Sequence, residues 1–301
     1  MTSLVHAMDV RTALKEAMGR LREACVPSPA LAAELLLMHV LGRDRAWLYA
    51  HPEEVVDAAS AGRYLDLVVR RIAGTPTQYL TKRQEFWGLE FAVEPGVLIP
   101  RPETEHVVEV ALERLTGRRD ARRRLRLADV GTGSGCLAVA LAHELPEGEV
   151  FATDISSRAL AVAQRNAARH GVSSRVHFVQ ANLLDPFLSP RSLVGGTSFF
   201  DLIVSNPPYL GRAEAPLLPP EVREHEPSEA LFSGEQGIEI YAPLIAQAEG
   251  LLTAGGVLVL ELGYNALSRV RALFDSPGVW TNVGVTNDLA GIPRVLAAER
   301  T

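Results

Sequence analysis

From residue 125 onward, hydrophobic segments typical of strands alternate with segments typical of helices, and this alternation restricts the possible folds more than any other feature. Strands are expected at 125–130, 149–153, 176–180, 200–205 and 256–262, with two closing strands near 279–286 and 294–298. Helices are expected at 104–115, 135–145, 157–170, 237–253 and 265–275. The alternation predicts an α/β fold, in which helices cover both faces of a mainly parallel sheet.

The chain before this region has helix signals and no strand pattern. Asp9 is placed to cap a first helix, and Ser28 and Gly42 have the residue types expected at the N-cap and the end of a second. A shorter segment, 43–51, and a fourth segment, 58–73, are expected to be helical as well. The expected organisation is a small helical-bundle domain at 1–74, a hairpin linker at 75–100 and the α/β domain at 101–301.

A glycine-rich loop, Gly131-Thr132-Gly133-Ser134-Gly135, separates the first strand of the α/β region from the helix after it. Glycine lets the backbone turn tightly and approach a ligand without a Cβ. The helix N-terminus behind the loop is expected to direct free N–H groups at that ligand. The third glycine of the dinucleotide pattern is missing, and no P-loop sequence occurs. The loop therefore predicts a ligand site but disfavours NAD and P-loop nucleotides.

Polar residues also follow the next two strands. Asp154 ends the second strand, roughly twenty residues after Gly131, where Rossmann-type folds place a carboxylate on a ribose diol. The third strand leads into Ala181, Asn182 and Leu183, which either flank an adenine ring or form an ordinary polar turn. Because ligands of such sheets bind outside the carboxyl ends of the strands, these residues are expected to line one site.

The fourth strand ends in Asn206-Pro207-Pro208-Tyr209, a segment that we call the elbow. Its prolines stop the strand, because neither can donate a ladder hydrogen bond. The Asn206 side-chain oxygen and the Pro207 carbonyl can accept the two N–H groups of an amide or exocyclic amine, and Tyr209 can pack against its plane. Such a nitrogen is a poor nucleophile, so holding it in line with an electrophile supplies much of the rate. The expected electrophile is the methyl group of S-adenosyl-L-methionine, which Asn206 would touch.

Charge and composition narrow the function further. The net charge of −6 and the pI near 5.8 argue against binding by broad neutralisation of nucleic-acid phosphates. Cys25 and Cys136 lack metal-ligand spacing, so we expect no metal and a reducing, cytoplasmic environment. The longest apolar stretch, 31–42, is too short for a membrane span and contains Glu34. The arginine-rich segment 116–127 is interpreted as a solvated loop.

Several motifs together resemble the peptide chain release factor glutamine N5-methyltransferase family, known as PrmC or HemK. They are "TPTQYLTKRQEFWGLEFAV", "LIPRPETE", "DVGTGSGCLAVALA", "SNPPYL", "EHEPSEALFSGEQGIEIY" and "LELGYN". The elbow sequence alone is shared by methyltransferases of nucleic-acid adenine and of protein glutamine. The combination is specific, and the resemblance covers nearly the whole chain.

The resemblance implies a Rossmann-like class I S-adenosylmethionine-dependent methyltransferase. Its expected substrate is the glutamine in the Gly-Gly-Gln loop of class-1 release factors, and its expected product is S-adenosyl-L-homocysteine. It implies that the glycine loop (Gly131 to Gly135) holds the methionine part and Asp154 the ribose. Asn182 and Leu183 would lie beside the adenine, and the elbow would grip the glutamine amide. The family often has Asp and a bulky aromatic where Asn182 and Leu183 stand, so the adenine contacts are expected to differ.

The helical domain carries no catalytic cluster, so we expect it to recognise the release factor, with no membrane or direct nucleic-acid contact. Segment 99–105, "IPRPETE", either lies over the cofactor, as the resemblance implies, or caps the following helix through Thr104 or its acids; the roles of Arg101 and Glu103 stay open. His225 and Glu226 are interpreted as members of a loop salt bridge, because the elbow needs no imidazole.

Three alternatives remain at this point. An adenine N6-methyltransferase of DNA or RNA would use the same elbow on a flipped base, but would be expected to have a basic groove. A non-catalytic partner-binding protein would have no need of the intact elbow. A Rossmann oxidoreductase is disfavoured by the missing third glycine.

Overall fold

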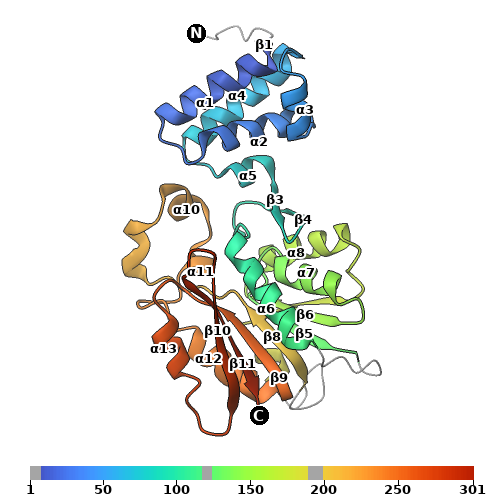
Figure 1. Ribbon diagram of the computed structural model, residues 1–301, viewed down its shortest axis with the longest axis vertical. Coiled ribbons are helices and arrows are strands. Elements are labelled where there is room, and N and C mark those ends of the chain that lie inside the picture. The colour runs from blue at the N-terminus through green and yellow to red at the C-terminus, as the bar shows by residue number, and fades with distance from the viewer. Residues whose placement is uncertain (1–7, 117–123, 189–198) are drawn as a thin grey trace. The chain divides into compact units, whose positions relative to one another are not determined.

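The computed structural model describes residues 8–116, 124–188 and 199–301, and Figure 1 shows its helices and strands. Backbone contacts divide the chain into two compact units. The first comprises Met1–Arg83 and Pro219–His225, and the second comprises Gln84–Leu218 and Glu226–Thr301. Each unit has hydrophobic core residues of its own. The arginine-rich segment 116–127 lies mostly outside the described residues.

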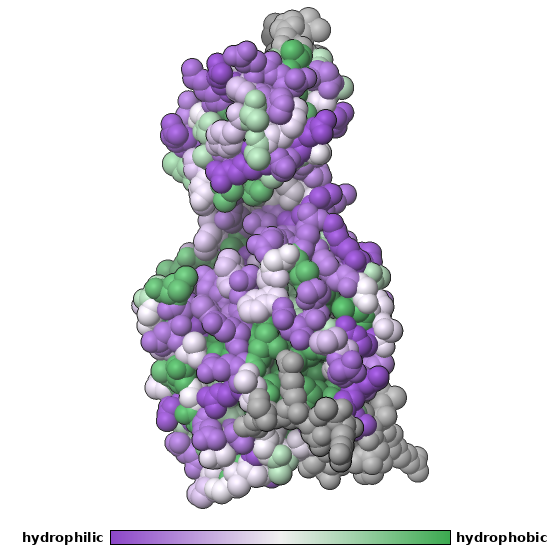
Figure 2. All heavy atoms as spheres, turned by 45° about the vertical axis from the view of Figure 1, so that its right-hand side comes forward, coloured by the Kyte–Doolittle hydropathy of each residue, from purple (hydrophilic) through white to green (hydrophobic). Residues whose placement is uncertain are grey.

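The first unit is a bundle of short helices, as the sequence predicts. They are α1 Val10–Glu23, α2 Pro29–Leu41, α3 Arg45–Ala50, α4 Ala58–Ile72, α5 Thr77–Thr81 and α10 Pro220–His225. Asp9 caps α1, because its carboxylate accepts a hydrogen bond from the Thr12 N–H at 2.7 Å. Fully buried residues such as Leu21, Leu36 and Tyr64 form the core. The surface of this unit drawn in Figure 2 is largely hydrophilic.

Three details of the first unit differ from the expectation. Ser28 stands at the N-cap of α2, but its φ of 49° is left-handed and its side chain makes no capping bond. Strands β1 Met8–Asp9 and β2 Val55–Val56 form an antiparallel pair that is too short for a sequence pattern. Helix α5 lies inside the expected linker, so this unit extends to Arg83 and not to residue 74. A five-residue helix is hard to predict because it contains little more than one turn.

A hairpin opens the second unit, as expected for the linker. Its strands are β3 Arg83–Phe86 and β4 Leu89–Ala92. The two residues between them, Trp87 and Gly88, have φ values of 55° and 68°. Positive φ at both positions is what a tight two-residue hairpin turn requires.

The seven-stranded sheet of the second unit has the order β10-β11-β9-β8-β5-β6-β7. The strands are β5 Arg126–Val130, β6 Glu149–Asp154, β7 Val176–Gln180, β8 Phe200–Ser205, β9 Leu252–Glu261, β10 Trp280–Asn287 and β11 Pro293–Arg300. Strands β5 to β9 are mutually parallel, and β11 is antiparallel to both of its neighbours, β9 and β10. The strand order reverses between β5 and β8, which is where ligands bind in sheets of this type.

Two cores lie on opposite faces of this sheet, because consecutive strand residues point to opposite sides. In β8, Leu202 and Val204 belong to one core and Ile203 to the other. The main helices of the unit are α6 Glu105–Leu115, α7 Cys136–Glu144, α8 Ser157–Arg169, α12 Tyr241–Leu251 and α13 Leu267–Ala272. Residues of α6, α7 and α8 contribute to the first core, and residues of α12 and α13 contribute to the second. The predicted α/β sheet with helices on both faces is confirmed.

The remaining differences concern element ends and short elements. Strand β9 starts at Leu252, earlier than the expected residue 256, and α12 starts at Tyr241, later than 237. Besides α5, five short helices were not predicted: α9 Asp185–Leu188, η1 Pro102–Thr104, η2 Arg212–Leu217, α11 Ser228–Leu231 and α10 of the first unit. Such elements contain too few residues for a periodicity. Among the described helices, none has the length and apolar character needed to cross a membrane.

Candidate active site

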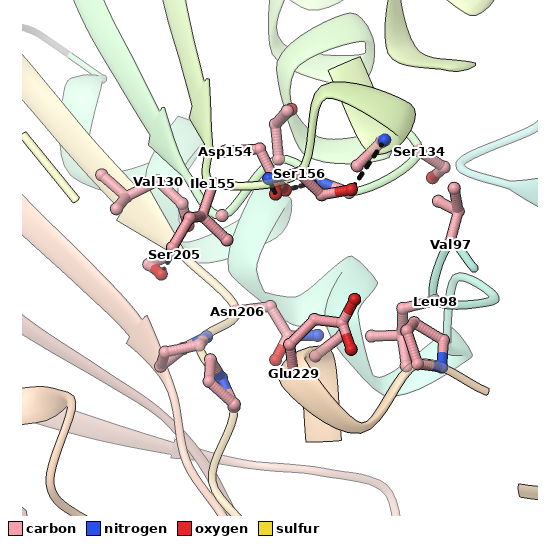
Figure 3. A pocket seen from close by; sticks show the side chains of 18 of the residues that line it. Val97, Leu98, Val130, Ser134, Asp154, Ile155, Ser156, Ser205, Asn206 and Glu229 are labelled. Atoms are coloured by element: carbon pink, nitrogen blue, oxygen red, sulfur yellow. Dashed lines mark hydrogen bonds between the residues drawn. The ribbon is translucent and has the colours of Figure 1, made fainter. Parts of the chain in front are cut away.

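A cavity of about 410 Å³ lies at the carboxyl ends of the parallel strands, and all its lining residues belong to the second unit. Four consecutive strand ends contribute to its wall: the glycine loop after β5, Asp154 after β6, Asn182 after β7 and Asn206 after β8. Residues of segments 96–100 and 227–233 also line the cavity, as does Thr104. In Figure 3, Asp154 and Asn206 lie on opposite sides of this pocket. The volume is within the usual range of small-molecule sites.

The glycine loop is held against the next strand by its own backbone. The N–H groups of Gly131 and Thr132 both donate to the Thr153 carbonyl at 2.9 Å, and the Gly133 N–H donates to Asp154 at 2.9 Å. These three N–H groups therefore already have acceptors within the protein, whereas the expected free N–H groups are those at the N-terminus of the helix behind the loop, where Ala138 N–H donates to Asp129 at 3.0 Å. Gly131 and Gly133 line the cavity with backbone that carries no side chain, so a ligand can approach it closely.

Gly135 differs from the other loop residues because it does not line the cavity. Its φ is 83°, and a Cβ there would lie 2.9 Å from the Cβ of Ala163 in α8. This glycine permits close packing of the loop on a helix, and its expected contact with a cofactor is not supported by the geometry. Ser134 does line the cavity, and its buried hydroxyl has the Cys136 thiol as a neighbour but no hydrogen-bond partner of good geometry among the described residues.

Asp129, which the sequence interpretation did not single out, holds the glycine loop in place through hydrogen bonds to the loop and to α7. Its Oδ2 accepts from the Thr132 hydroxyl at 2.6 Å and from the Ala138 N–H at 3.0 Å. The side chain is completely buried, and burial raises its pKa to about 7. The signal that could have identified it is its position immediately before Val130 and the loop, at the end of a buried strand.

Asp154 connects the loop to the cavity. Its Oδ2 accepts from the Gly133 N–H and its Oδ1 from the Ser156 N–H at 2.8 Å. An ionised carboxylate has about four acceptor sites, so these two bonds leave room for two ligand hydroxyls. The Asp154 side chain is half-buried, and this burial is the main cause that raises the pKa of its carboxyl group.

The expected adenine side of the cavity is largely apolar. Asn182 is exposed and Leu183 half-buried, and both line the wall. Ile155, which the sequence interpretation missed, is 64% exposed and lines the wall next to Asp154. An exposed isoleucine directly after a strand-end acid was the available signal. A flat apolar ring would cover the exposed surfaces of Ile155 and Leu183.

The elbow follows β8 at the strand-order reversal. Asn206, Pro207 and Pro208 line the cavity, whereas Tyr209 does not. The Tyr209 ring packs close to Gly263, whose added Cβ would lie 3.1 Å from a ring carbon. The expectation that Tyr209 offers its face to a bound amide is therefore not supported here. Tyr209 is half-buried against the second core of the sheet and supports the elbow from behind.

The Asn206 side chain has a defined partner. Its Nδ2 donates to the Thr104 hydroxyl at 2.9 Å, and Thr104 is buried in the cavity wall. Thr104 precedes α6, but its side chain makes no capping bond, so the capping interpretation of this threonine is wrong. With Nδ2 engaged by Thr104, the Oδ1 acceptor of Asn206 remains for a ligand.

Two charged residues of segment 99–105 and of the "EHEP" motif, Arg101 and Glu226, have each other as partners. Arg101 forms an ion pair with Glu226, and Glu226 also accepts from the Ile99 N–H at 3.2 Å. The loop salt bridge expected for Glu226 is thus confirmed. His225 ends α10 and belongs to the first unit.

The described wall of the cavity carries acidic side chains and no basic ones. The only ionisable acids in its described lining are Asp154 and Glu229, and no lysine, arginine or histidine lines it. Glu229 lies in α11, and its charge contributes to the raised pKa of Asp154. Figure 3 shows the side chains of Glu229 and Asn206 among those that line this pocket. Such a wall suits a cationic ligand and disfavours phosphates.

Comparisons with known proteins agree with this geometry. Residues 12–81 match the PrmC N-terminal domain, and residues 104–216 match the methyltransferase small domain. The release factor glutamine methyltransferase of Koribacter versatilis is 43% identical over 293 residues, covering 97% of this chain and 99% of that protein. Its counterpart from Moorella thermoacetica is 44% identical over 293 residues, with coverages of 97% and 99%.

Among solved structures, the N-terminal domain of human METTL16 has a TM-score of 0.52 at 20% identity. It covers 83% of this chain and 85% of that chain, and at this identity it supports the fold alone. The two full-length relatives and the two matched domains agree with the resemblance inferred from the motifs. This chain belongs to the release factor glutamine methyltransferase family.

Proposed function

We propose that this protein transfers the methyl group of S-adenosyl-L-methionine to the side-chain amide nitrogen of a release-factor glutamine, leaving S-adenosyl-L-homocysteine. The specific target is the glutamine of the Gly-Gly-Gln motif in class-1 release factors. The observation that carries the proposal is the elbow: Asn206 directs a fixed amide into the same cavity that Asp154 and the glycine loop line. The protein would act in the cytoplasm, where release factors work.

The residues of the cavity fit the cofactor. Its sulfonium is cationic, and the described wall carries two carboxylates, from Asp154 and Glu229, and no basic side chain. The glycine loop and the buried Ser134 hydroxyl, which has no hydrogen-bond partner of good geometry among the described residues, suit the methionine part. Asp154 suits the ribose hydroxyls, and Ile155 with Leu183 suits the adenine ring. When bound, the cofactor supplies the methyl group as electrophile.

The elbow would prepare the acceptor nitrogen. An amide nitrogen is a weak nucleophile because its lone pair is delocalised into the carbonyl. Asn206 Oδ1 and the Pro207 carbonyl would each accept one N–H of the glutamine amide, which orients the nitrogen and favours loss of a proton after attack. Orientation of this kind can account for about 7–11 kcal/mol of a barrier. Pro208 stiffens the turn, and Tyr209 supports it by packing on Gly263.

Recognition of the release factor is assigned to the helical unit. This assignment is supported by the match of residues 12–81 to the PrmC N-terminal domain, and none of the described residues of this unit lines the cavity. Hydrogen exchange measured with and without a release factor is expected to show protection of amides in α1–α5. If protection were confined to the second unit, the recognition role would be wrong.

The proposed reaction is tested by incubating the full chain with S-adenosyl-L-methionine and a class-1 release factor, followed by peptide mass mapping. We expect one added methyl group, located on the Gly-Gly-Gln glutamine. A factor with that glutamine changed to glutamate is the control and should gain none. Methylation of adenine in DNA or RNA oligonucleotides, with none on the factor, would instead favour the nucleic-acid alternative.

A further inference from the structure

Glu261, the last residue of β9, is a buried acid that the proposed transfer does not itself use. The side chain is 1% exposed, and the pairing of Ser205 with Leu260 brings it beside the end of β8, where the elbow begins. Neither carboxylate oxygen has a hydrogen-bond partner of good geometry among the described residues. Burying a carboxylate is unfavourable unless it is paired, so its presence next to the elbow needs an explanation.

Two hydroxyl groups face this carboxylate: that of Thr104 in η1 and that of Tyr209 in the elbow, and both lower its pKa. Thr104 Oγ1 accepts from Asn206 Nδ2 at 2.9 Å. A threonine hydroxyl has one proton to donate. Because Asn206 donates to this hydroxyl, its own proton is available to the neighbouring Glu261 carboxylate, which in its ionised form can only accept.

We propose that Glu261 is a positioning residue that determines which end of the Asn206 side-chain amide faces the cavity. Ionised Glu261 holds the Thr104 proton, Thr104 then accepts from Asn206 Nδ2, and Asn206 Oδ1 is left to accept from the substrate amide. This inference rests on the proposed function, in which that oxygen grips the glutamine. It adds Glu261 and Thr104 to the residues that set the rate.

The orientation is expected to depend on pH. Protonated Glu261 can donate to Thr104, Thr104 can then donate to Asn206, and the amide would turn its NH₂ group toward the cavity. Burial is the main cause that raises the pKa of Glu261 to about 7. From the surrounding elements, Arg294 of β11 lowers this pKa and Glu103 of η1 raises it, while Tyr209 also lowers it.

Two further titratable groups, those of Tyr241 and Cys136, interact with Glu261. The Tyr241 hydroxyl donates to the Glu261 backbone carbonyl at 2.8 Å, and the Cys136 thiol has its own pKa raised in part by Glu261. Asp288 neutralises much of Arg294, with 2.9 Å between Arg294 Nη2 and Asp288 Oδ2. We therefore expect turnover to rise with pH near neutrality, as Glu261 ionises.

The test compares the parent chain with Glu261→Gln in single-turnover methylation of a release factor across this pH range. Glutamine has the same shape but does not titrate, and it can offer either end to Thr104. We expect about tenfold slower transfer above neutral pH, an unchanged Kd for S-adenosyl-L-methionine and loss of the rise near neutrality. Asp129 also titrates near this pH, but it is present in both proteins, so a rise caused by Asp129 would persist in the variant.

Two further comparisons isolate the path through Thr104. Thr104→Val removes the hydroxyl and should reproduce the loss, whereas Thr104→Ser keeps it and should lose less; these variants also serve if Glu261→Gln does not fold. In an Asn206→Asp background, whose two side-chain oxygens are equivalent, Glu261→Gln should have little further effect.

If the parent chain methylates the factor and folded Glu261→Gln has the same rate and pH profile, the positioning role is overturned and the proposed function stands. A parent chain that transfers no methyl group to any class-1 factor would overturn both.

Discussion

Replacing Asp154 by alanine tests the proposed cofactor site where the glycine loop meets the cavity. The carboxylate accepts from the N–H groups of Gly133 and Ser156 at 2.9 and 2.8 Å, and it lines the cavity wall. Alanine removes the acceptors for two ribose hydroxyls and also releases Gly133 from the end of β6. The loop keeps its anchor at Thr153, which accepts from Gly131 and Thr132, so the fold should survive.

The expected loss follows from these contacts. A hydrogen bond to a charged group contributes about 1.5–3 kcal/mol. Because Asp154 is half-buried and water can replace part of the contact, we expect one such contribution in total, which corresponds to a Kd about tenfold to a hundredfold weaker. Asp154→Asn keeps the shape and one acceptor oxygen, so it should lie between alanine and the parent chain.

The measurement is calorimetric titration of the full chain with S-adenosyl-L-methionine and S-adenosyl-L-homocysteine. It is made at a pH above the raised pKa of Asp154, so that the carboxylate is ionised. Thermal unfolding of each variant is the control for folding. A folded Asp154→Ala that binds both ligands as tightly as the parent chain would show that Asp154 does not hold the ribose.

Three other predictions test the elbow, the loop and its buried acid. Asn206→Ala should abolish most methyl transfer in single-turnover assays at nearly unchanged cofactor affinity, and Asn206→Asp should retain more activity; transfer at the parent rate by alanine would reduce Asn206 to a turn residue. Gly135→Ala should destabilise the fold by about 1–3 kcal/mol in urea unfolding, because its φ is 83° and its Cβ would meet Ala163 at 2.9 Å; an unchanged midpoint would contradict this. Burial raises the pKa of Asp129 from 3.8 to about 7, so the folded state binds its proton more tightly and stability should fall as pH rises through that window. Asp129→Asn should reduce this slope, and an identical pH dependence of the unfolding free energy would refute the assignment.

The long elements of the fold were predictable because their patterns are local. The strand before the glycine loop, the acid at Asp154 and the prolines of the elbow lie at strand ends that parallel pairing brings to one edge of a sheet. Elements of three to six residues, such as η1 and α11, were missed because they contain too few residues to display a period. Strand β9 begins at Leu252, before the expected residue 256, and it contains Gly255 and Gly256, a residue type that is depleted in strands.

Within the site, some of the residues predicted from sequence spacing line the cavity and others pack against a neighbouring element. Gly131, Asp154 and Asn206 line the cavity as expected, but Gly135 and Tyr209 do not. Both exceptions have the right sequence spacing and face a neighbour instead, in α8 and at Gly263. Sequence spacing predicts that a residue lies at the end of a strand, but it does not predict whether that residue faces the cavity or a neighbouring element.

The α/β class, the helical N-terminal region, the family and the strand ends that line the cavity could be predicted from the sequence, because each depends on periodicity or on a contiguous motif. The contacts that hold the site together became visible in the three-dimensional structure. Thr104 and Asn206 are 102 residues apart in the chain, and their hydrogen bond exists because η1 and the end of β8 meet at the cavity. Glu261 reaches the elbow through the pairing of β8 with β9, and the cavity is acidic because Glu229 of α11 and Asp154 of β6 face the same space. Such contacts depend on the packing of separate elements, which no local pattern in the chain encodes.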